Sequence, residues 1–201
     1  FRGASILFLM ALVLTASMLS SCKSKFLDGD IVFHHSVSSQ STAVSNATDS
    51  ELTHMGIICF IDGEIFVFEA INTTTFTPLK EWKMRGESKK YIVMRLKTFP
   101  DDLTSKIPEA VKYAKTLQGK SYDSLFLWSD DEIYCSELVW KVYYYGLGIK
   151  LCELKRFADY DLSSSEVARI IQERYKGNFP KDELVVAPSD IYNSPLLKRI
   201  K

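Results

Sequence analysis

The stretch HMGIICFIDGEIFVFEAI, residues 54–71, determines how the surrounding chain must fold. Two runs of apolar and β-branched residues, 54–61 and 64–71, flank Asp62-Gly63. An Asp-Gly pair between two such runs indicates a hairpin with a type I′ turn, because both central residues of that turn need φ > 0. Both faces of this hairpin are mainly apolar, so we expect it to lie inside a sheet that is covered on both sides.

Two polar side chains interrupt one apolar face of this hairpin. With a two-residue loop, His54 lies opposite Ile71 and Gly56 lies opposite Glu69. His54 and Glu69 are then diagonal neighbours, roughly 7 Å apart or less. Gly56 leaves room for the carboxylate to lean toward the imidazole. A three-residue loop with a bulge would shift this register and separate the pair.

The composition is that of an ordinary globular protein. The chain has 201 residues, 25 Lys and Arg against 25 Asp and Glu, and a hydrophobic fraction of 46%. This excludes a disordered or coiled-coil protein and favours one domain with a full hydrophobic core. Because the net charge is zero, the chain lacks the basic footprint of a nucleic-acid binder, and we expect no nucleic-acid partner.

The first 22 residues have the pattern of an export signal. The apolar run from Ala4 to Leu19 is shorter than the ~20 residues that span a bilayer core. It ends in Leu19-Ser20-Ser21-Cys22, which resembles the lipobox of bacterial lipoproteins. That resemblance implies a signal peptide over residues 1–22, acylation of Cys22, and a lipid-anchored domain over residues 23–201 at the bacterial cell envelope. An uncleaved signal anchor with a chance cysteine is the alternative.

The rest of the chain mixes strands and helices without a regular βαβ alternation or a Gly-rich phosphate loop. We therefore predict an α+β fold. The expected strands, besides the hairpin, lie over 31–33 and 91–96, and a loop with one short helix is expected within 34–50. A helix over 108–117 would have Pro108 in its first turn and Gly119 just past its end, and a helix over 135–145 would end at Gly146. A last helix, to about Tyr175, would follow a Ser163-x-x-Glu166 capping box.

Among the cysteines after Cys22, Cys135 has the most suggestive position. Cys59 lies within a strand and is expected to be a small buried hydrophobe, and Cys152 has no acid or base nearby in the sequence. Cys135 stands where a helix is predicted to begin. Unpaired N–H groups and the positive end of the helix dipole there favour a thiolate, and the N–H of Cys135 could help to bind an oxyanion. A purely structural cysteine at this position remains the alternative.

The chain contains only three histidines. We expect His34 and His35, which lead into a polar loop, to be solvated. His54 has Glu69 on its own face, so Cys135 as nucleophile, His54 as base and Glu69 as the residue that orients the imidazole would form a catalytic triad. Zinc held by His34, His54 and a cysteine would lack closely spaced ligand pairs, so we expect neither a metal nor a cofactor.

A series of short motifs in a fixed order resembles the circularly permuted branch of the NlpC/p60 papain-like superfamily, in particular its YiiX-like proteins. In the unpermuted family the cysteine helix precedes the histidine strand, whereas here His54 precedes Cys135. The motifs, which extend from about Gly29 to Leu197, are Gly29-Asp30-Ile31-Val32-Phe33, Ser38-Ser39-Gln40-Ser41, His54-Met55-Gly56-Ile57, Phe68-Glu69-Ala70, Gly119-Lys120-Ser121-Tyr122-Asp123, Tyr134-Cys135-Ser136-Glu137-Leu138-Val139 and Pro188-Ser189-Asp190-Ile191.

The resemblance implies a papain-like antiparallel sheet with packed helices. It also implies Cys135 as the nucleophile, His54 as the base and Glu69 as the third residue, and Tyr122 matches a tyrosine that lies beside the active site and positions substrate. His34-His35 matches no role in the family.

The function that follows is a thiol-dependent hydrolase or acyltransferase. It would cleave amide or ester bonds through an acyl-enzyme on Cys135, as a papain-like amidase, peptidase or lipid acyl hydrolase. The expected substrates are lipids, acylated amino acids or peptidoglycan peptides, and the expected membrane contact is the N-terminal lipid anchor. A catalytically inert lipoprotein that binds lipid or peptide in the same groove is the alternative.

Overall fold

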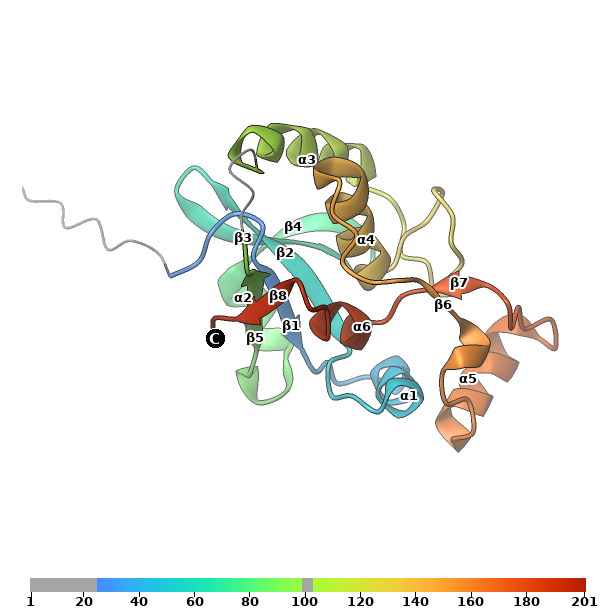
Figure 1. The fold of residues 1–201 in the computed structure, drawn as a ribbon. Coiled ribbons are helices and arrows are strands. Elements are labelled where there is room, and N and C mark those ends of the chain that lie inside the picture. The colour runs from blue at the N-terminus through green and yellow to red at the C-terminus, as the bar shows by residue number, and fades with distance from the viewer. Residues whose placement is uncertain (1–24, 99–102) are drawn as a thin grey trace, which may run out of the picture.

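A computed structural model describes residues 25–98 and 103–201, and one antiparallel sheet lies at their centre (Figure 1). The sheet has the strand order β4-β3-β2-β1-β5-β8. The strands are β1 (Ile31–His34), β2 (His54–Ile61), β3 (Glu64–Ala70), β4 (Thr74–Pro78), β5 (Ile92–Leu96) and β8 (Leu197–Arg199), and a separate ribbon pairs β6 (Lys155–Arg156) with β7 (Leu184–Val185).

Helices and helical turns connect these strands. The described α-helices are α1 (Ser39–Thr48), α2 (Leu79–Arg85), α3 (Leu103–Leu117), α4 (Cys135–Lys141), α5 (Ser165–Tyr175) and α6 (Pro188–Tyr192), with 3₁₀ turns at η1 (Glu87–Lys89) and η3 (Phe157–Asp159) and a π-helical segment at η2 (Val142–Gly146). The predicted α+β class is therefore confirmed. The expected signal peptide, its boundary and the lipidation at Cys22 lie outside the described residues.

The hairpin of β2 and β3 forms as its sequence predicts. Asp62 has φ of +52° and Gly63 has φ of +82°, as a type I′ turn requires. The register begins at Ile61 opposite Glu64 and continues with the pairing expected from a two-residue loop. Both of these residues at the hairpin tip are exposed. Burial on both faces therefore holds only for the end of the hairpin that contains His54.

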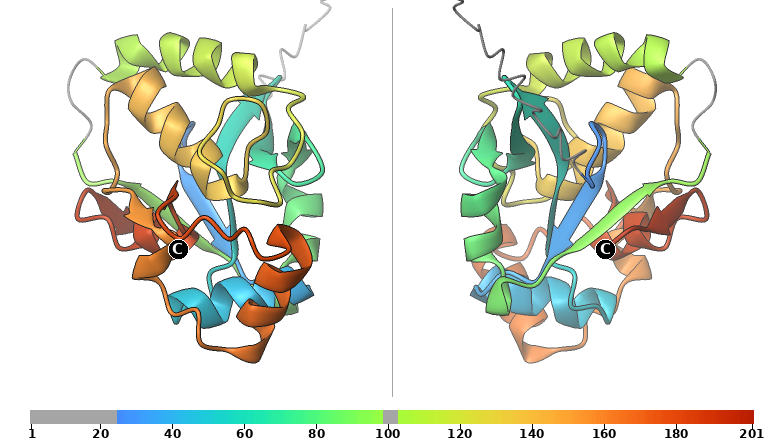
Figure 2. Two further views of the ribbon diagram at one scale, coloured as in Figure 1. Left: turned by 90° about the vertical axis from the view of Figure 1, so that its right-hand side faces the viewer. Right: turned by 90° about the vertical axis from the view of Figure 1, so that its left-hand side faces the viewer.

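Helices cover both faces of the sheet (Figure 2). On one face, Met55 and Phe68 share a buried cluster with Leu138 of α4, and α3 completes the layer. On the other face, Trp82 of α2 packs in a second cluster with Val67. Because successive residues of a strand point to opposite faces, β2 and β3 contribute to both clusters.

Helix α3 begins earlier than the sequence indicates. It starts at Leu103 and contains Pro108 in its interior rather than in its first turn. A proline removes one backbone donor from a helix but does not prevent an earlier turn from forming. The predicted end is confirmed, since the helix stops at Leu117 and Gly119 adopts φ of +83°.

The helix that begins at Cys135 changes its pitch before it ends. Regular α-helix stops at Lys141 and continues as a π-helical segment to Gly146, which is the predicted end. A Cβ at Gly146 would lie 2.7 Å from Cα of Ala110. Only glycine therefore allows α3 to pack this closely against the segment.

The start of α5 differs by one residue from the predicted capping box. Ser164, not Ser163, is the N-cap, and its hydroxyl accepts a hydrogen bond from the N–H of Val167 at 3.3 Å. The helix ends at Tyr175, as predicted.

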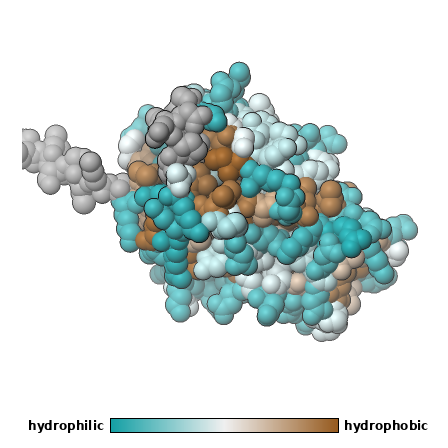
Figure 3. Space-filling model, in the orientation of Figure 1, coloured by the Kyte–Doolittle hydropathy of each residue, from teal (hydrophilic) through white to brown (hydrophobic). Residues whose placement is uncertain are grey.

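The face shown in Figure 3 is mostly hydrophilic, with apolar residues gathered in a few patches. Within residues 25–98 and 103–201, the helices are too short or too polar to cross a bilayer.

The close packing at Gly56 generates a prediction about stability. A Cβ added there would lie 2.4 Å from Cγ1 of Val67 and 2.8 Å from the backbone oxygen of Phe68. We expect Gly56→Ala to lower the free energy of unfolding by about 1–3 kcal/mol, because the backbone must shift to accept the methyl group. Urea unfolding followed by circular dichroism measures this. Glu64→Ala, at an exposed site of the same hairpin, is the control and should change the value by less than about 0.5 kcal/mol. Equal stability of the two variants would contradict the packing argument.

Candidate active site

His54 and Glu69 form a buried pair at the base of the hairpin. His54 is the first residue of β2, and its Nε2 lies 2.6 Å from Oε2 of Glu69 on β3. The imidazole is 8% exposed and the carboxylate is fully buried. The diagonal contact that the register predicts is therefore present.

Two further side chains hold the carboxylate of Glu69. Thr77 of β4 donates a hydrogen bond from its hydroxyl to Oε1 at 2.5 Å, and Arg85 at the end of α2 donates to the same oxygen. Burial alone would raise the pKa of Glu69, but the hydrogen bonds and the charge of His54 reverse this and lower the pKa to about 2. The group is therefore an anion throughout the physiological range. No sequence motif marks Thr77 or Arg85, because only the pairing of β3 with β4 and the docking of α2 bring them here.

Cys135 is placed against His54 by helix packing. It is the first residue of α4, which packs on β2 and β3, and it is only 4% exposed. Its side chain lies close enough to the His54 ring to raise the pKa of that imidazole. Because Glu69 occupies Nε2, the nitrogen left for the sulfur is Nδ1. The structure thus brings together the three side chains that the sequence analysis assigned to the triad.

The protonation of His54 reflects its two neighbours. Burial alone would lower its pKa, but the interactions with the Cys135 side chain and with the hydrogen-bonded carboxylate of Glu69 raise it to about 9. His54 is therefore an imidazolium at neutral pH. It is held between a sulfur on one side and a permanent anion on the other.

Tyr122 and Cys135 line the same pocket. Burial and the charge of Cys135 raise the pKa of Tyr122 well above its usual range, so the phenol remains protonated. Gln40 of α1 donates from Nε2 to the phenol oxygen at 2.8 Å, and Arg174 of α5 donates to Oε1 of Gln40 at 2.7 Å. Since the phenol oxygen already accepts a hydrogen bond, its own proton is free to be donated elsewhere.

The other described cysteines have environments of a different kind. Burial raises the pKa of both Cys59 and Cys152 to about 12. Neither thiol has a histidine partner among the described residues. Both are therefore protonated at neutral pH, which agrees with their predicted structural role.

The prediction that His34 is a solvated loop residue is wrong. His34 is the last residue of β1, lies directly opposite His54 in the sheet and is 2% exposed. Its ring packs edge-on against Trp82 with 4.3 Å between centroids and lies 5.1 Å from the ring of His54. Burial and the charge of His54 lower its pKa to about 3, so His34 is neutral at physiological pH. Its burial depends on the docking of α2, which the sequence does not indicate.

His35 points away from this cluster. Its Nδ1 lies 2.8 Å from the backbone oxygen of Glu51, and its side chain is more exposed than that of His34. Adjacent residues of an extended chain point apart, so only one of the two histidines reaches the site.

Metal ligation does not fit the described residues. In residues 25–98 and 103–201, no group of three or more His, Cys, Asp or Glu side chains is placed to hold a metal ion.

The raised pKa of His54 generates a prediction that NMR can test. The imidazole should titrate near pH 9. In Glu69→Gln its pKa should fall toward the ordinary 6.5, because burial lowers the pKa of the ring and the charge of Glu69 no longer opposes this effect. The folded-state pKa lies above the ordinary value. Protonated His54 therefore stabilises the fold fully below pH 6.5, and that contribution disappears as the pH rises through about 9. Glu64→Gln, an exposed change on the same strand, is the control. An unchanged His54 titration in Glu69→Gln would show that the carboxylate does not set it.

Comparisons with known proteins identify the family to which this chain belongs. Residues 25–201 match the model of the permuted papain-like amidase family YaeF/YiiX, known as C92. The chain is 40% identical over 173 residues to the protein YiiX of Escherichia coli (strain K12), an alignment that covers 86% of this chain and 84% of YiiX. A crystal structure of YiiX from Escherichia coli O157:H7, described there as a metalloprotein, superposes with a TM-score of 0.84 at 38% identity and covers 89% of this chain and 98% of that one. The predicted permuted papain-like fold is confirmed, and the chain belongs to the YaeF/YiiX family of permuted papain-like amidases.

Proposed function

We propose that this protein is a cysteine-dependent amidase of the papain type, with Cys135 as nucleophile, His54 as acid and base, and Glu69 as the residue that orients the imidazole. The observation that carries the proposal is the continuous line of contacts from the sulfur through the imidazole to a buried anion. A fully buried carboxylate is costly unless each oxygen is hydrogen-bonded. Here the histidine is one of its three partners, which fixes the ring in one orientation.

The reaction begins with attack of the Cys135 sulfur on the carbonyl carbon of an amide. A C–S bond forms, and the carbonyl electrons move onto oxygen. The electrons return, the C–N bond breaks, and the amine leaves with the proton of His54. Water, deprotonated by His54, then attacks the thioester. This step releases a carboxylic acid and restores the thiolate–imidazolium pair.

Two donors are available for the oxygen that becomes negative during attack. In the described part of the chain, the backbone N–H of Cys135 has no acceptor, since it belongs to the first turn of α4. The phenol proton of Tyr122 is free because Gln40 donates to its oxygen. We assign both groups to stabilising the oxyanion. Tyr122 would position the substrate by donating its proton to this oxygen.

The same acyl-enzyme supports related reactions. Ester substrates would form the same thioester, and an amine or alcohol in place of water would make the enzyme an acyltransferase. An inert binding protein with this fold would need no protonated histidine between a sulfur and a buried carboxylate. The arrangement around His54 therefore favours catalysis over simple binding.

We propose in addition that the protein works at the bacterial cell envelope, held there by lipid on Cys22. The support is the lipobox-like sequence that ends at Cys22 and the apolar run before it. Two or three acyl chains would give a durable anchor, at about 0.8 kcal/mol per buried CH₂.

Thiol labelling and turnover together test the catalytic assignment. Iodoacetamide at neutral pH should label Cys135 before Cys59 and Cys152, and His54→Ala should suppress that labelling. Hydrolysis of a chromogenic anilide should fall at least about 10³-fold in Cys135→Ala and about 10²- to 10⁴-fold in Glu69→Gln.

Cys59→Ala is the matched control for these assays, and it should retain turnover. Full activity in purified Cys135→Ala, or equal labelling of all three thiols in both the wild type and His54→Ala, would refute the mechanism.

Membrane attachment is tested separately in bacterial cells. The full-length chain should fractionate with membranes and incorporate labelled palmitate, and Cys22→Ser should abolish the incorporation. Cys152→Ser serves as the control. Incorporation of label into the Cys22→Ser variant would exclude a lipid anchor at that residue.

A further inference from the structure

Lys141, in α4, is a buried cation that lies outside the proposed triad. Its side chain is only 3% exposed, although an ammonium group is costly to remove from water. Nζ lies 2.8 Å from Oε1 of Glu137, one turn earlier on the same helix, and 2.7 Å from Oδ1 of Asp130. It also donates to the backbone oxygen of Ser129 and lies 5.1 Å from the centre of the Trp128 ring. Three of these four partners belong to the loop that precedes α4.

This loop, residues 123–133, begins and ends beside the proposed reaction centre. Tyr122 immediately precedes it, and Cys135 stands two residues after it. A β-bridge joins Tyr122 to Ile133, so the two ends of the loop are in contact. Figure 1 shows the loop, in yellow, beside α4. A shift of the loop along α4 would therefore move the Tyr122 hydroxyl relative to the Cys135 sulfur.

Asp130 connects α4 to the segment that carries Tyr122. Its carboxylate pairs with Lys141, and its backbone oxygen accepts a hydrogen bond from Nζ of Lys120, two residues before Tyr122. The hydrogen bond and the charge of Lys141, with a smaller contribution from Lys120, lower the pKa of Asp130. The carboxylate is therefore an anion at neutral pH, and contacts run without interruption from α4 through Asp130 to the Tyr122 segment.

Glu137 holds the ammonium of Lys141 from the side of the helix. It is fully buried, and burial raises its pKa to about 7 even though Lys141 opposes this effect. Its Oε2 accepts a hydrogen bond from the N–H of Tyr134 at 3.3 Å. A buried ion pair adds little stability compared with apolar packing, but it requires one defined geometry. The pair is therefore better suited to keeping the ammonium at one place on α4 than to stabilising the fold.

We propose that Lys141 and Asp130 are positioning residues, which fix the Tyr122 hydroxyl relative to Cys135 by holding the loop of residues 123–133 against α4. The proposal rests on the function proposed above, in which Tyr122 donates to the oxyanion. Asp130 belongs to neither the triad nor the oxyanion donors, so its effect on the reaction must pass through the loop.

Asp130→Asn tests the loop side of this contact at a side chain that is 84% exposed. We expect kcat for a chromogenic anilide to fall about fivefold while KM changes less than about twofold, because the substrate still binds but the oxyanion donor is misplaced. Asp131→Asn, at the neighbouring exposed carboxylate, is the matched control and should leave both constants unchanged.

A double-mutant cycle with Tyr122→Phe separates positioning from a general loss of structure. Removal of the hydroxyl should lower kcat about 10²- to 10³-fold, the usual cost of losing one oxyanion donor. In that background Asp130→Asn should have less than about a twofold further effect, because the donor that it misplaces is already absent. Equal losses with and without the hydroxyl would overturn the proposal, and so would full activity in Tyr122→Phe.

Hydrogen exchange gives a readout that does not depend on catalysis. In Asp130→Asn and in Lys141→Met, mass spectrometry should show amide exchange within residues 121–134 that is at least about fivefold faster than in the wild type. Asp131→Asn should not change it, and Lys112→Met, at an exposed lysine of α3, is the control for the loss of a lysine.

Exchange that stays at the wild-type rate in Asp130→Asn would overturn the proposal, because the loop would then be held without this contact. Hydrolysis that persists in Cys135→Ala would instead overturn the proposed function. The exchange rates would still decide whether Lys141 and Asp130 hold the loop.

Discussion

The buried carboxylate of Glu69 is the constraint on which the rest of the site depends. It is fully shielded from solvent, and its lowered pKa means that it is charged. Each of its oxygens therefore needs a hydrogen-bond donor. Its donors are His54, Thr77 and Arg85, which come from the neighbouring strands β2 and β4 and from α2. The carboxylate therefore ties three elements to β3. A change in hairpin register or in the position of α2 would leave an unpaired charge in the core.

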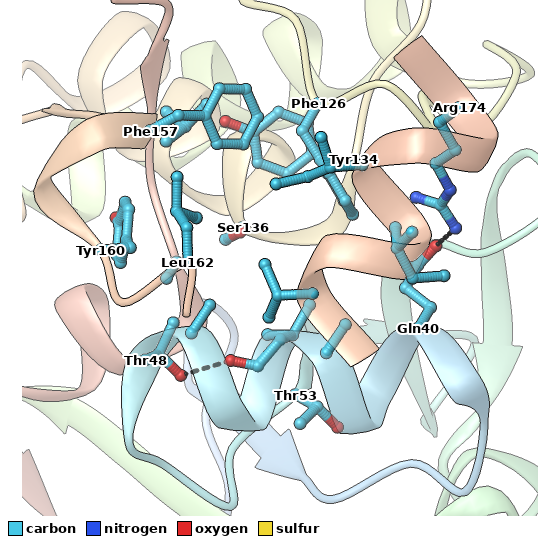
Figure 4. A pocket seen from close by; sticks show the side chains of 18 of the residues that line it. Gln40, Thr48, Thr53, Phe126, Tyr134, Ser136, Phe157, Tyr160, Leu162 and Arg174 are labelled. Atoms are coloured by element: carbon cyan, nitrogen blue, oxygen red, sulfur yellow. Dashed lines mark hydrogen bonds between the residues drawn. The ribbon is translucent and has the colours of Figure 1, made fainter. Parts of the chain in front are cut away.

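The sequence predicts the parts of this arrangement that depend on local chemistry. The Asp62-Gly63 turn determines the register, and the register alone brings His54 to Glu69. The start of α4 at Cys135 is likewise visible in the sequence. Thr77, Arg85 and the burial of His34 are not, because each depends on contacts between elements that are distant in the chain. An apolar pocket beside Cys135 also escapes prediction, since it exists only where α1 meets α5 (Figure 4).

Two histidines at neighbouring positions of the sheet have opposite protonation. His34 and His54 face each other across β1 and β2 with 5.1 Å between ring centroids, yet the pKa of one is lowered to about 3 and that of the other raised to about 9. Both rings are buried, so burial cannot cause the difference. His54 contacts Glu69 and Cys135, whereas His34 packs against Trp82 and faces the cationic His54. Contact with Glu69 and Cys135, rather than burial, therefore determines which ring holds the proton.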